Sequence, residues 1–280
     1  MYRHILAAIN EHSNSEAAAR YAVAAAAAAG ASLTLAFVAP PGLPPERVRS
    51  VEAALERLFL EASAKKVPVQ SLLSTGEPVR QLKHLVREQH VDLAFVATRR
   101  EDLSRRYFTR TIARRLSLAL PCSVALVRVV HPGRVISRHL LVPLMGTIPH
   151  LEERALLVGL LAQAFGARVT LFHAPRRLER FFRGAGEVPV TEREPGVIRR
   201  MEEFMTLLAR FQVETRQRFR RGRPAAAITT EAAVSRHDLI IMGGSTRGLL
   251  ASLVSGNPVE EVLRETPCNL IIHLPRGFGV

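Results

Sequence analysis

The chain has 280 residues, 48% of them hydrophobic and 23% charged, which is long enough for two domains and excludes an intrinsically disordered protein. No apolar stretch reaches the roughly eighteen uncharged residues of a membrane span, and two cysteines, Cys122 and Cys268, exclude a disulfide framework. The net charge of +14 comes from both parts of the chain, 19 basic and 11 acidic residues in 1–136 and 20 and 14 in 137–280, and favours polyanionic partners.

The first part of the chain alternates short apolar runs with longer amphipathic stretches, the pattern of βαβ units around a parallel sheet. Its first helix begins at Ser13-Asn14-Ser15-Glu16, where a hydroxyl and a glutamate three residues apart predict a capping box. Turn residues at His131-Pro132-Gly133-Arg134 interrupt two apolar strands and mark a linker. We expect the strands of this part at residues 5–9, 32–38, 67–73, 93–97 and 124–129.

The remainder of the chain repeats the first part. His4-Ile5-Leu6 corresponds to His139-Leu140-Leu141 at an offset of 135, and Gly76-Glu77-Pro78 to Gly222-Arg223-Pro224 at an offset of 146. The change in offset places one insertion near residues 176–208, which we expect to form a loop and then a helix from Pro195. A lid over a site and a partner-docking element are both open interpretations of this insertion. We expect the strands of the second copy at residues 140–144, 169–173, 213–219, 239–242 and 270–273.

The segment Met242-Gly243-Gly244-Ser245-Thr246-Arg247-Gly248, with the later Ser255-Gly256-Asn257-Pro258, resembles the C-terminal signature of the universal stress protein family. That signature is a glycine, two residues, a glycine, nine residues, and then glycine with serine, threonine or asparagine. The resemblance implies two tandem Rossmann-like α/β domains, residues 1–133 and 137–280, each a five-stranded parallel sheet with helices on both faces. Domains of this family pair through their last strands, so 124–129 and 270–273 are expected to meet within one chain as a pseudo-dimer.

In ATP-binding members of the family this loop wraps the phosphates, and an aspartate that ends the first strand helps to hold the nucleoside. In the second copy the middle glycine of the motif falls on Thr246 and the aspartate on Met145, whereas Gly243 and Gly256-Asn257 are kept. Glycines let backbone N–H groups approach phosphate oxygens closely, which supports a nucleotide site here. The alternative is that the glycines only form a turn and that Asn257 only caps a following helix. The predicted site residues are Gly243, Gly244, Ser245, Thr246, Arg247, Gly256 and Asn257.

The first copy departs further from the family motif. Its three glycine positions fall on Ala97, Arg100 and Arg110, although Asn10 stands at the aspartate position. Arginine side chains would occupy the family's phosphate channel, so we expect the first copy to be structural, with a degenerate nucleotide loop. The arginines of this region are Arg99, Arg100, Arg105, Arg106, Arg110, Arg114 and Arg115.

Two of these arginines are predicted at the start of a helix. Thr111 aligns with the capping residue Asn257, which places Arg114 and Arg115 in the first helical turn. Cations at a helix N-terminus oppose the helix dipole. We expect both side chains to point into water, where screening keeps this penalty small. The alternative is that an anion held at this terminus offsets it.

A second group of arginines, Arg216, Arg218 and Arg220, alternates along one expected strand and therefore shares one of its faces. Such a run is typical of a solvated edge strand that is protected against aggregation. The alternative is a patch that binds a polyanion.

The sequence thus predicts a stress-response regulatory protein of the cytoplasm that binds ATP or another adenine nucleotide, with or without Mg²⁺, in its second copy. No Ser, His and Asp arrangement indicates a catalytic nucleophile, so we expect no enzyme beyond weak ATP hydrolysis, and the scattered histidines predict no metal site. The alternative is a binding module without nucleotide, whose arginine-rich surface docks an acidic protein, nucleic acid or an anionic membrane. A homodimer of two such chains is left open.

Overall fold

The computed structural model describes residues 1–98, 111–144, 150–174, 195–244 and 258–276. Strands and helices alternate in both halves, and the observed strands agree with the predicted ones to within about two residues at each end. The first half contains β1 (His4–Ile9), α1 (Ser13–Ala29), β2 (Ser32–Ala39), α2 (Pro45–Ala64), β3 (Val69–Thr75), α3 (Pro78–Glu88), β4 (Leu93–Thr98), α4 (Ile112–Ala119) and β5 (Ser123–Arg128). The second half contains β6 (His139–Pro143), α5 (Leu151–Phe165), β7 (Arg168–His173), α6 (Pro195–Ala209), β8 (Thr215–Phe219), α7 (Pro224–Val234), β9 (Leu239–Gly243), α9 (Pro258–Glu265) and β10 (Asn269–Leu274).

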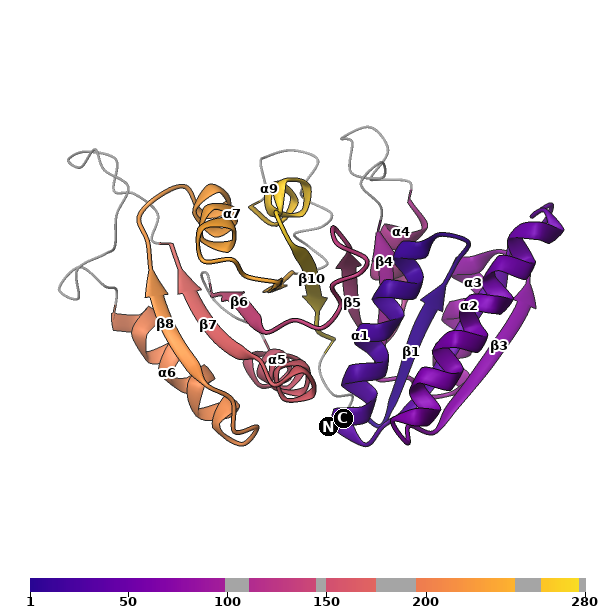
Figure 1. Cartoon of the computed structure of the whole chain (residues 1–280), viewed down its shortest axis with the longest axis horizontal. Helices are drawn as coiled ribbons and strands as arrows, with labels where there is room; N and C mark the ends of the chain where they lie inside the picture. Colours follow the sequence, from indigo (N-terminus) through magenta and orange to yellow (C-terminus); the bar gives the residue numbers. More distant parts are fainter. Residues whose placement is uncertain (99–110, 145–149, 175–194, 245–257, 277–280) are drawn as a thin grey trace.

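These strands form one sheet that runs through both halves (Figure 1), in the order β3-β2-β1-β4-β5-β10-β9-β6-β7-β8. Within each half the neighbouring strands are parallel, as the sequence predicts. At the centre β5 and β10 pair antiparallel, with Leu270 opposite Arg128 and Leu274 opposite Val124. The prediction that the last strands of the two copies meet within one chain is therefore confirmed.

Helices cover both faces of the sheet. The helices α1, α2, α5 and α6 pack over one face, around a core that includes Tyr21, Leu58 and Phe204. On the other face lie α3, α4, α7 and α9, which contribute Leu82 and Ile228 to a second core. Burial on both faces explains why central strands such as β4 and β9 are continuous apolar runs, whereas the edge strands β3 and β8 have exposed residues. Since α1 also packs against α5, each core extends across the two halves.

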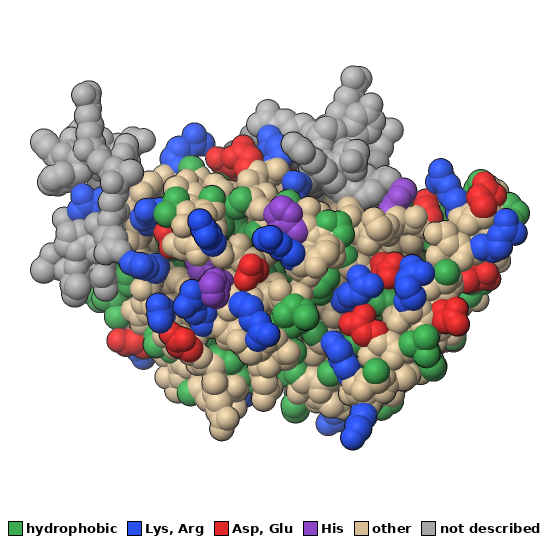
Figure 2. Space-filling model, in the orientation of Figure 1, with side chains coloured by type: hydrophobic (Ala, Val, Ile, Leu, Met, Phe, Trp, Pro, Cys, Tyr) green, Lys and Arg blue, Asp and Glu red, His purple; other side chains and the backbone are tan. Residues whose placement is uncertain are grey.

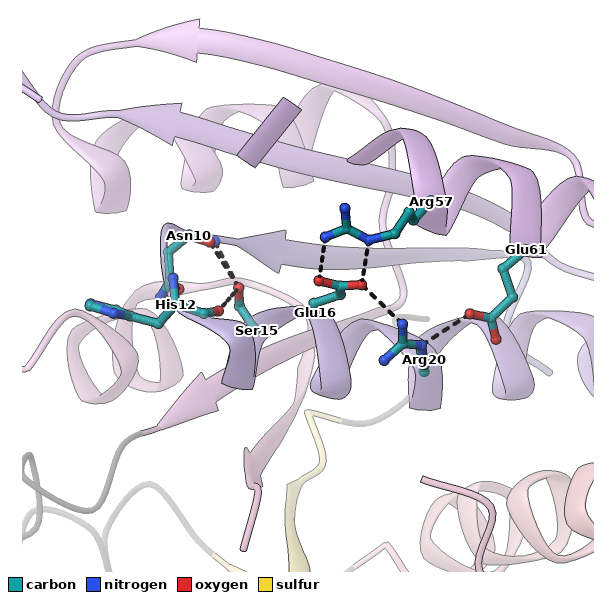
Figure 3. A network of polar contacts seen from close by, with 7 residues as sticks. All are labelled: Asn10, His12, Ser15, Glu16, Arg20, Arg57 and Glu61. Carbon is teal, nitrogen blue, oxygen red and sulfur yellow. Dashed lines mark hydrogen bonds and ion pairs between the residues drawn. The ribbon is translucent and has the colours of Figure 1, made fainter. Parts of the chain in front are cut away.

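The start of α1 corrects one prediction, because Ser13 and Glu16 form no capping box. The N-cap is His12, which makes no side-chain capping bond, and the hydroxyl of Ser15 accepts a hydrogen bond from the Asn10 N–H at 3.0 Å. The carboxylate of Glu16 instead pairs with Arg57 of α2 at 2.9 Å, as Figure 3 shows. An arginine from the neighbouring helix is a stronger partner for this carboxylate than a backbone N–H group.

The predicted arginine strand is β8, which lies at one edge of the sheet. The side chains of Arg216 and Arg218 are exposed, whereas Phe219 on the opposite face is buried, so the edge-strand prediction is confirmed. The helix of the insertion begins at Pro195 as predicted, and the preceding loop lies outside the described residues. Among the helices that the structure describes, none combines the length and the apolar character needed to cross a bilayer.

Candidate ligand site

A cavity of about 410 Å³ opens in the first half, at the carboxyl ends of β1, β2 and β4. This edge is where ligands bind in open parallel α/β sheets, and the volume lies in the range of small-molecule sites. The apolar part of the walls comes from residues of both cores of the sheet. They include Ile9, Phe37, Val38, Leu82, Val96 and Leu116.

Asn10, which stands where the family has its aspartate, lines this cavity at the end of β1. Its Oδ1 accepts a hydrogen bond from the His12 N–H at 2.9 Å and so fixes the turn into α1 (Figure 3). The amide Nδ2 is then the atom that remains for a ligand acceptor, because Oδ1 is already engaged. Asn10 therefore supplies a positioned donor, beside Glu11 and His12, which also line the cavity.

The N-terminus of α4 forms another side of the same cavity. Thr111 caps this helix as predicted, since its Oγ1 accepts from the Arg114 N–H at 3.2 Å. Ile112 and Ala113 line the cavity at the first two helical positions, whose N–H groups have no partner within a helix. These groups and the helix dipole make this side of the cavity suited to an anionic group.

Arg114 and Arg115, at the start of α4, differ in exposure and in their partners. Arg114 is only 4% exposed, and its Nη1 lies 3.9 Å from Oε1 of Glu260 on α9 in the other half. Burial lowers the pKa of Arg114, and the Glu260 carboxylate partly offsets this effect. The expectation that Arg114 points into water is therefore wrong, because a carboxylate from the other half offers it a buried partner. Arg115 is half exposed and pairs with Glu77 at 3.0 Å.

In the second half, the structure describes the first two residues of the predicted phosphate loop. A side chain at Gly243 would collide with the guanidinium of Arg154, and a Cβ at Gly244 would lie 2.7 Å from Cδ2 of Leu274. A side chain at Gly243 would thus require the Arg154 guanidinium to move, and one at Gly244 would press on the side chains of Leu274 and Ile272. Arg154 is a residue that the sequence reasoning missed, although it is a charge within the apolar helix α5.

The remaining residues of the predicted second-half site, Ser245, Thr246, Arg247, Gly256 and Asn257, lie outside the described residues, as does Met145. The helix predicted after Asn257 does begin at Pro258. Arg99, Arg100, Arg105, Arg106 and Arg110 of the first copy are also outside the described residues. The second-half phosphate loop thus stays a prediction.

A buried polar cluster joins the two halves beside Arg154. Tyr2 and Ser123 from the first half donate hydrogen bonds to Oε1 of Glu153, the former at 3.2 Å. His273 Nε2 lies 3.5 Å from the same oxygen. Burial raises the pKa of Glu153, but hydrogen bonds from His273, Ser123 and Tyr2 outweigh it and lower that pKa. No local sequence signal marks this cluster, because its members come from four separate elements.

Charge on the surface is mixed rather than segregated. On the face that Figure 2 shows, basic and acidic side chains are interspersed over both halves. Several arginines are engaged by carboxylates, among them Arg57 with Glu16 and Arg216 with Glu214. Within the described part of the chain, no cluster of three or more His, Cys, Asp or Glu residues could hold a metal ion.

Two Rossmann-like halves that share one sheet, with a cavity at the carboxyl ends of the strands of the first half, define a tandem α/β fold. The chain belongs to the universal stress protein family, whose model matches residues 1–128 and 139–273. It is 32% identical over 128 residues to a universal stress protein encoded beside a sulfhydrylase gene of Thermus aquaticus, which covers 44% of this chain and 89% of that protein.

Solved structures show the same tandem fold. A universal stress protein from Archaeoglobus fulgidus is similar over 96% of this chain and 95% of its own, with a TM-score of 0.62 and 14% identity. The cytoplasmic domain of a prokaryotic cation chloride cotransporter is similar over 100% and 98%, with a TM-score of 0.59 and 13% identity. At these identities the likeness establishes the fold alone.

Proposed function

We propose that this protein is a stress-response regulator that binds an adenine nucleotide in the cavity of its first half, and that it binds rather than catalyses. The observation that carries the proposal is the cavity of about 410 Å³ at the carboxyl ends of β1, β2 and β4. Its apolar walls suit a base, while Asn10 offers a donor and the N-terminus of α4 offers N–H groups to a phosphate.

The charge of the sequence between β4 and α4 supports an anionic ligand. Residues 99–110, which connect β4 to α4, contain five arginines against two acidic residues. Arginine binds phosphate through its guanidinium, so such a segment can replace the glycine N–H groups of the family motif as a source of phosphate contacts. The sequence motif by itself assigns the nucleotide to the second half, and the experiment below separates the two assignments.

The two cysteines are consistent with the reducing cytoplasm that we propose for this protein. Cys122 and Cys268 are buried free thiols, and burial raises the pKa of each to about 12. Such thiols are inert core residues, and they require no oxidising compartment.

The test is calorimetric titration of the full chain with Mg-ATP, and with ADP, AMP and inorganic polyphosphate for comparison. Ala8→Phe places a large side chain in the cavity, and Ala27→Phe adds the same side chain on the exposed surface of α1. We expect binding to the wild type and to Ala27→Phe, and a loss of at least tenfold in affinity for Ala8→Phe.

Two other outcomes of this titration would reject the proposed site. Unchanged ATP affinity in Ala8→Phe would reject the first-half cavity and favour the second-half loop. Binding of polyphosphate that equals that of ATP and disappears in moderate salt would reject a nucleotide site and leave the basic docking module.

A further inference from the structure

The sheet ends at two strands, β3 in the first half and β8 in the second (Figure 1). The offset of 146 makes these strands equivalent and aligns Arg216, Arg218 and Arg220 with uncharged residues of β3. Arginines along an edge strand hinder its pairing with another chain. All seven residues of β3 are uncharged, none is proline or glycine, and five of them are exposed. The β3 edge therefore lacks the protection that the β8 edge has.

The segments around the two edges differ in charge in the same way. Residues 45–75, which contain α2 and β3, have five basic and four acidic side chains. Residues 195–221, which contain α6 and β8, have seven basic and three acidic side chains. Two copies of the chain would therefore repel each other much less through their β3 edges than through their β8 edges.

Two apolar side chains are exposed beside the β3 edge, on the face of the sheet that α2 covers. Arg57 and Glu61 of α2 both form ion pairs with α1. Phe59 is two residues from each of them, so it lies on the opposite flank of the helix, toward the edge of the sheet. Phe59 is 39% exposed, and Leu73 of β3 is 47% exposed. Leu73 is on the same face, because it lies opposite Phe37 of the core under α2.

The centre of the sheet shows how this fold covers such an edge. There β5 pairs antiparallel with β10, and α1 packs against α5 across the junction. Each pair consists of equivalent elements of the repeat, so the contact has approximate two-fold symmetry. The same arrangement of two copies at the other end of the sheet would pair β3 with β3 and bring α2 beside α2, where Phe59 and Leu73 would be covered.

Charges on α2 fit this arrangement. Two helices related by a two-fold axis across paired strands run antiparallel, so the N-terminal part of one lies beside the C-terminal end of the other. Glu52 is seven residues before Phe59, and Lys66, just after the end of the helix, is seven residues after it. Within the described residues neither forms an ion pair, and a second copy would bring Glu52 toward Lys66.

We propose that two copies of this chain associate through their β3 edges, with β3 pairing antiparallel to β3 and α2 packing against α2. A contact between equal edges is self-complementary and closes as a dimer, which is why the partner is a second copy and not a different strand. Association through β3 requires no nucleotide.

Sedimentation equilibrium of the full chain over a range of concentrations measures this association. Ser74→Arg gives β3 the residue that stands at the equivalent position after β8, Arg220, where the fold accommodates it. With arginine on both edges, the affinity of the dimer should fall by more than about tenfold. Thr206→Arg, on the exposed surface of α6, is the matched control and should dimerise like the wild type. A thermal unfolding scan verifies that each variant is folded.

Hydrogen exchange of the wild type locates the contact without any substitution. The amides of β3 should exchange more slowly at concentrations where the protein is dimeric, whereas those of β8 should not change. A wild type that stays monomeric, or a folded Ser74→Arg protein that dimerises as tightly as the wild type, overturns this inference. Growth into larger species with protection of β8 also overturns it, because β3 would then pair head to tail with β8.

Discussion

The two halves of this chain share a fold but differ where the strands end. In the first half Asn10 and Ala97 border an open cavity, and in the second half Arg154 lies over Gly243. The strand cores on either side have changed little in character, because burial on both faces tolerates only apolar residues of similar size. A duplication can therefore keep its architecture while the side chains at the strand ends differ between its two halves.

At the contact between the halves, too, equivalent positions have the same backbone arrangement but different side chains. Residues 123 and 269 correspond at the offset of 146, as do 130 and 276. Oδ1 of Asn269 accepts from the Val130 N–H at 2.8 Å, and Oγ of Ser123 accepts from the Arg276 N–H at 2.9 Å. The backbone of this contact is thus pseudo-symmetric. The two equivalent side chains, Asn269 and Ser123, differ, and each accepts a hydrogen bond from a backbone N–H of the other half.

The largest effect is expected at Asn269, which is fully buried. Its amide donates to Tyr21 and to the Arg134 carbonyl, and its oxygen accepts from Val130 and His131. Asn269→Ala leaves several buried groups without partners and should lower the free energy of unfolding by about 3 kcal/mol. Urea denaturation measures the loss.

The corresponding change in the other half is its control. Ser123→Ala removes one hydroxyl and should cost about 1 kcal/mol, because fewer groups lose a partner. Equal losses for Asn269→Ala and Ser123→Ala would mean that the two halves of the contact are equivalent, contrary to the comparison above.

A charge swap tests the ion pair between equivalent positions. Arg114 and Glu260 also correspond at the offset of 146, and they lie 3.9 Å apart. Arg114→Glu brings two carboxylates together and should lower the free energy of unfolding by about 2 kcal/mol. Combining it with Glu260→Arg should restore about 1 kcal/mol, as measured by a double-mutant cycle in urea. A double variant whose loss equals the sum of the single losses would show that the residues do not interact.

Acid should weaken the contact between the halves through His273. This side chain is 1% exposed, and burial lowers its pKa below the ordinary 6.5, with Glu153 partly offsetting the effect and with Arg154 and His150 adding to it. Because the unfolded chain takes up a proton below pH 6.5 that the folded chain does not, stability is full above that pH and falls as the pH drops.

The carboxylate of Glu153 acts in the same direction at lower pH. Its pKa is also lowered in the folded protein, so its contribution is present above the ordinary value of 4.5 and is lost as the pH falls through the folded value. Urea midpoints between pH 7 and 5 should decline for the wild type and decline less for His273→Gln. Parallel profiles for the two proteins would assign the acid sensitivity to other groups.

Local pattern was enough to predict the strands and helices, and the family resemblance supplied the pairing of β5 with β10. The central strands are predictable because helices bury both of their faces, so each is a run of consecutive apolar residues, whereas the edge strand β8 is predictable from its alternating arginines. The helix start at Thr111 was predictable from the repeat, because Thr111 aligns with the expected cap Asn257, and its side chain does cap the helix.

Contacts between distant residues could not be predicted. Glu16 pairs with Arg57 and forms no capping box, and Arg114 lies buried beside Glu260 and does not point into water. Both partners come from other helices, and only the folded chain brings them close. Arg154 was missed because a single arginine in an apolar helix does not reveal which strand end it will cover. Gly243 is also the residue that the Arg154 guanidinium approaches, a contact that the sequence motif does not reveal.

The smallest effect is expected at Arg115, the neighbour of Arg114 in the sequence. Arg115 is half exposed, and its Nη2 lies 3.0 Å from Oε1 of Glu77, which is also well exposed. Exposed ion pairs contribute about 0.5 kcal/mol or less, and salt screens them, so Arg115→Ala should barely change the urea midpoint in 0.15 M salt. We attribute the different contributions of these two adjacent arginines to the burial of Arg114 against the other half, not to their position in the first helical turn. A loss in the free energy of unfolding as large as that of Arg114→Glu would contradict this explanation.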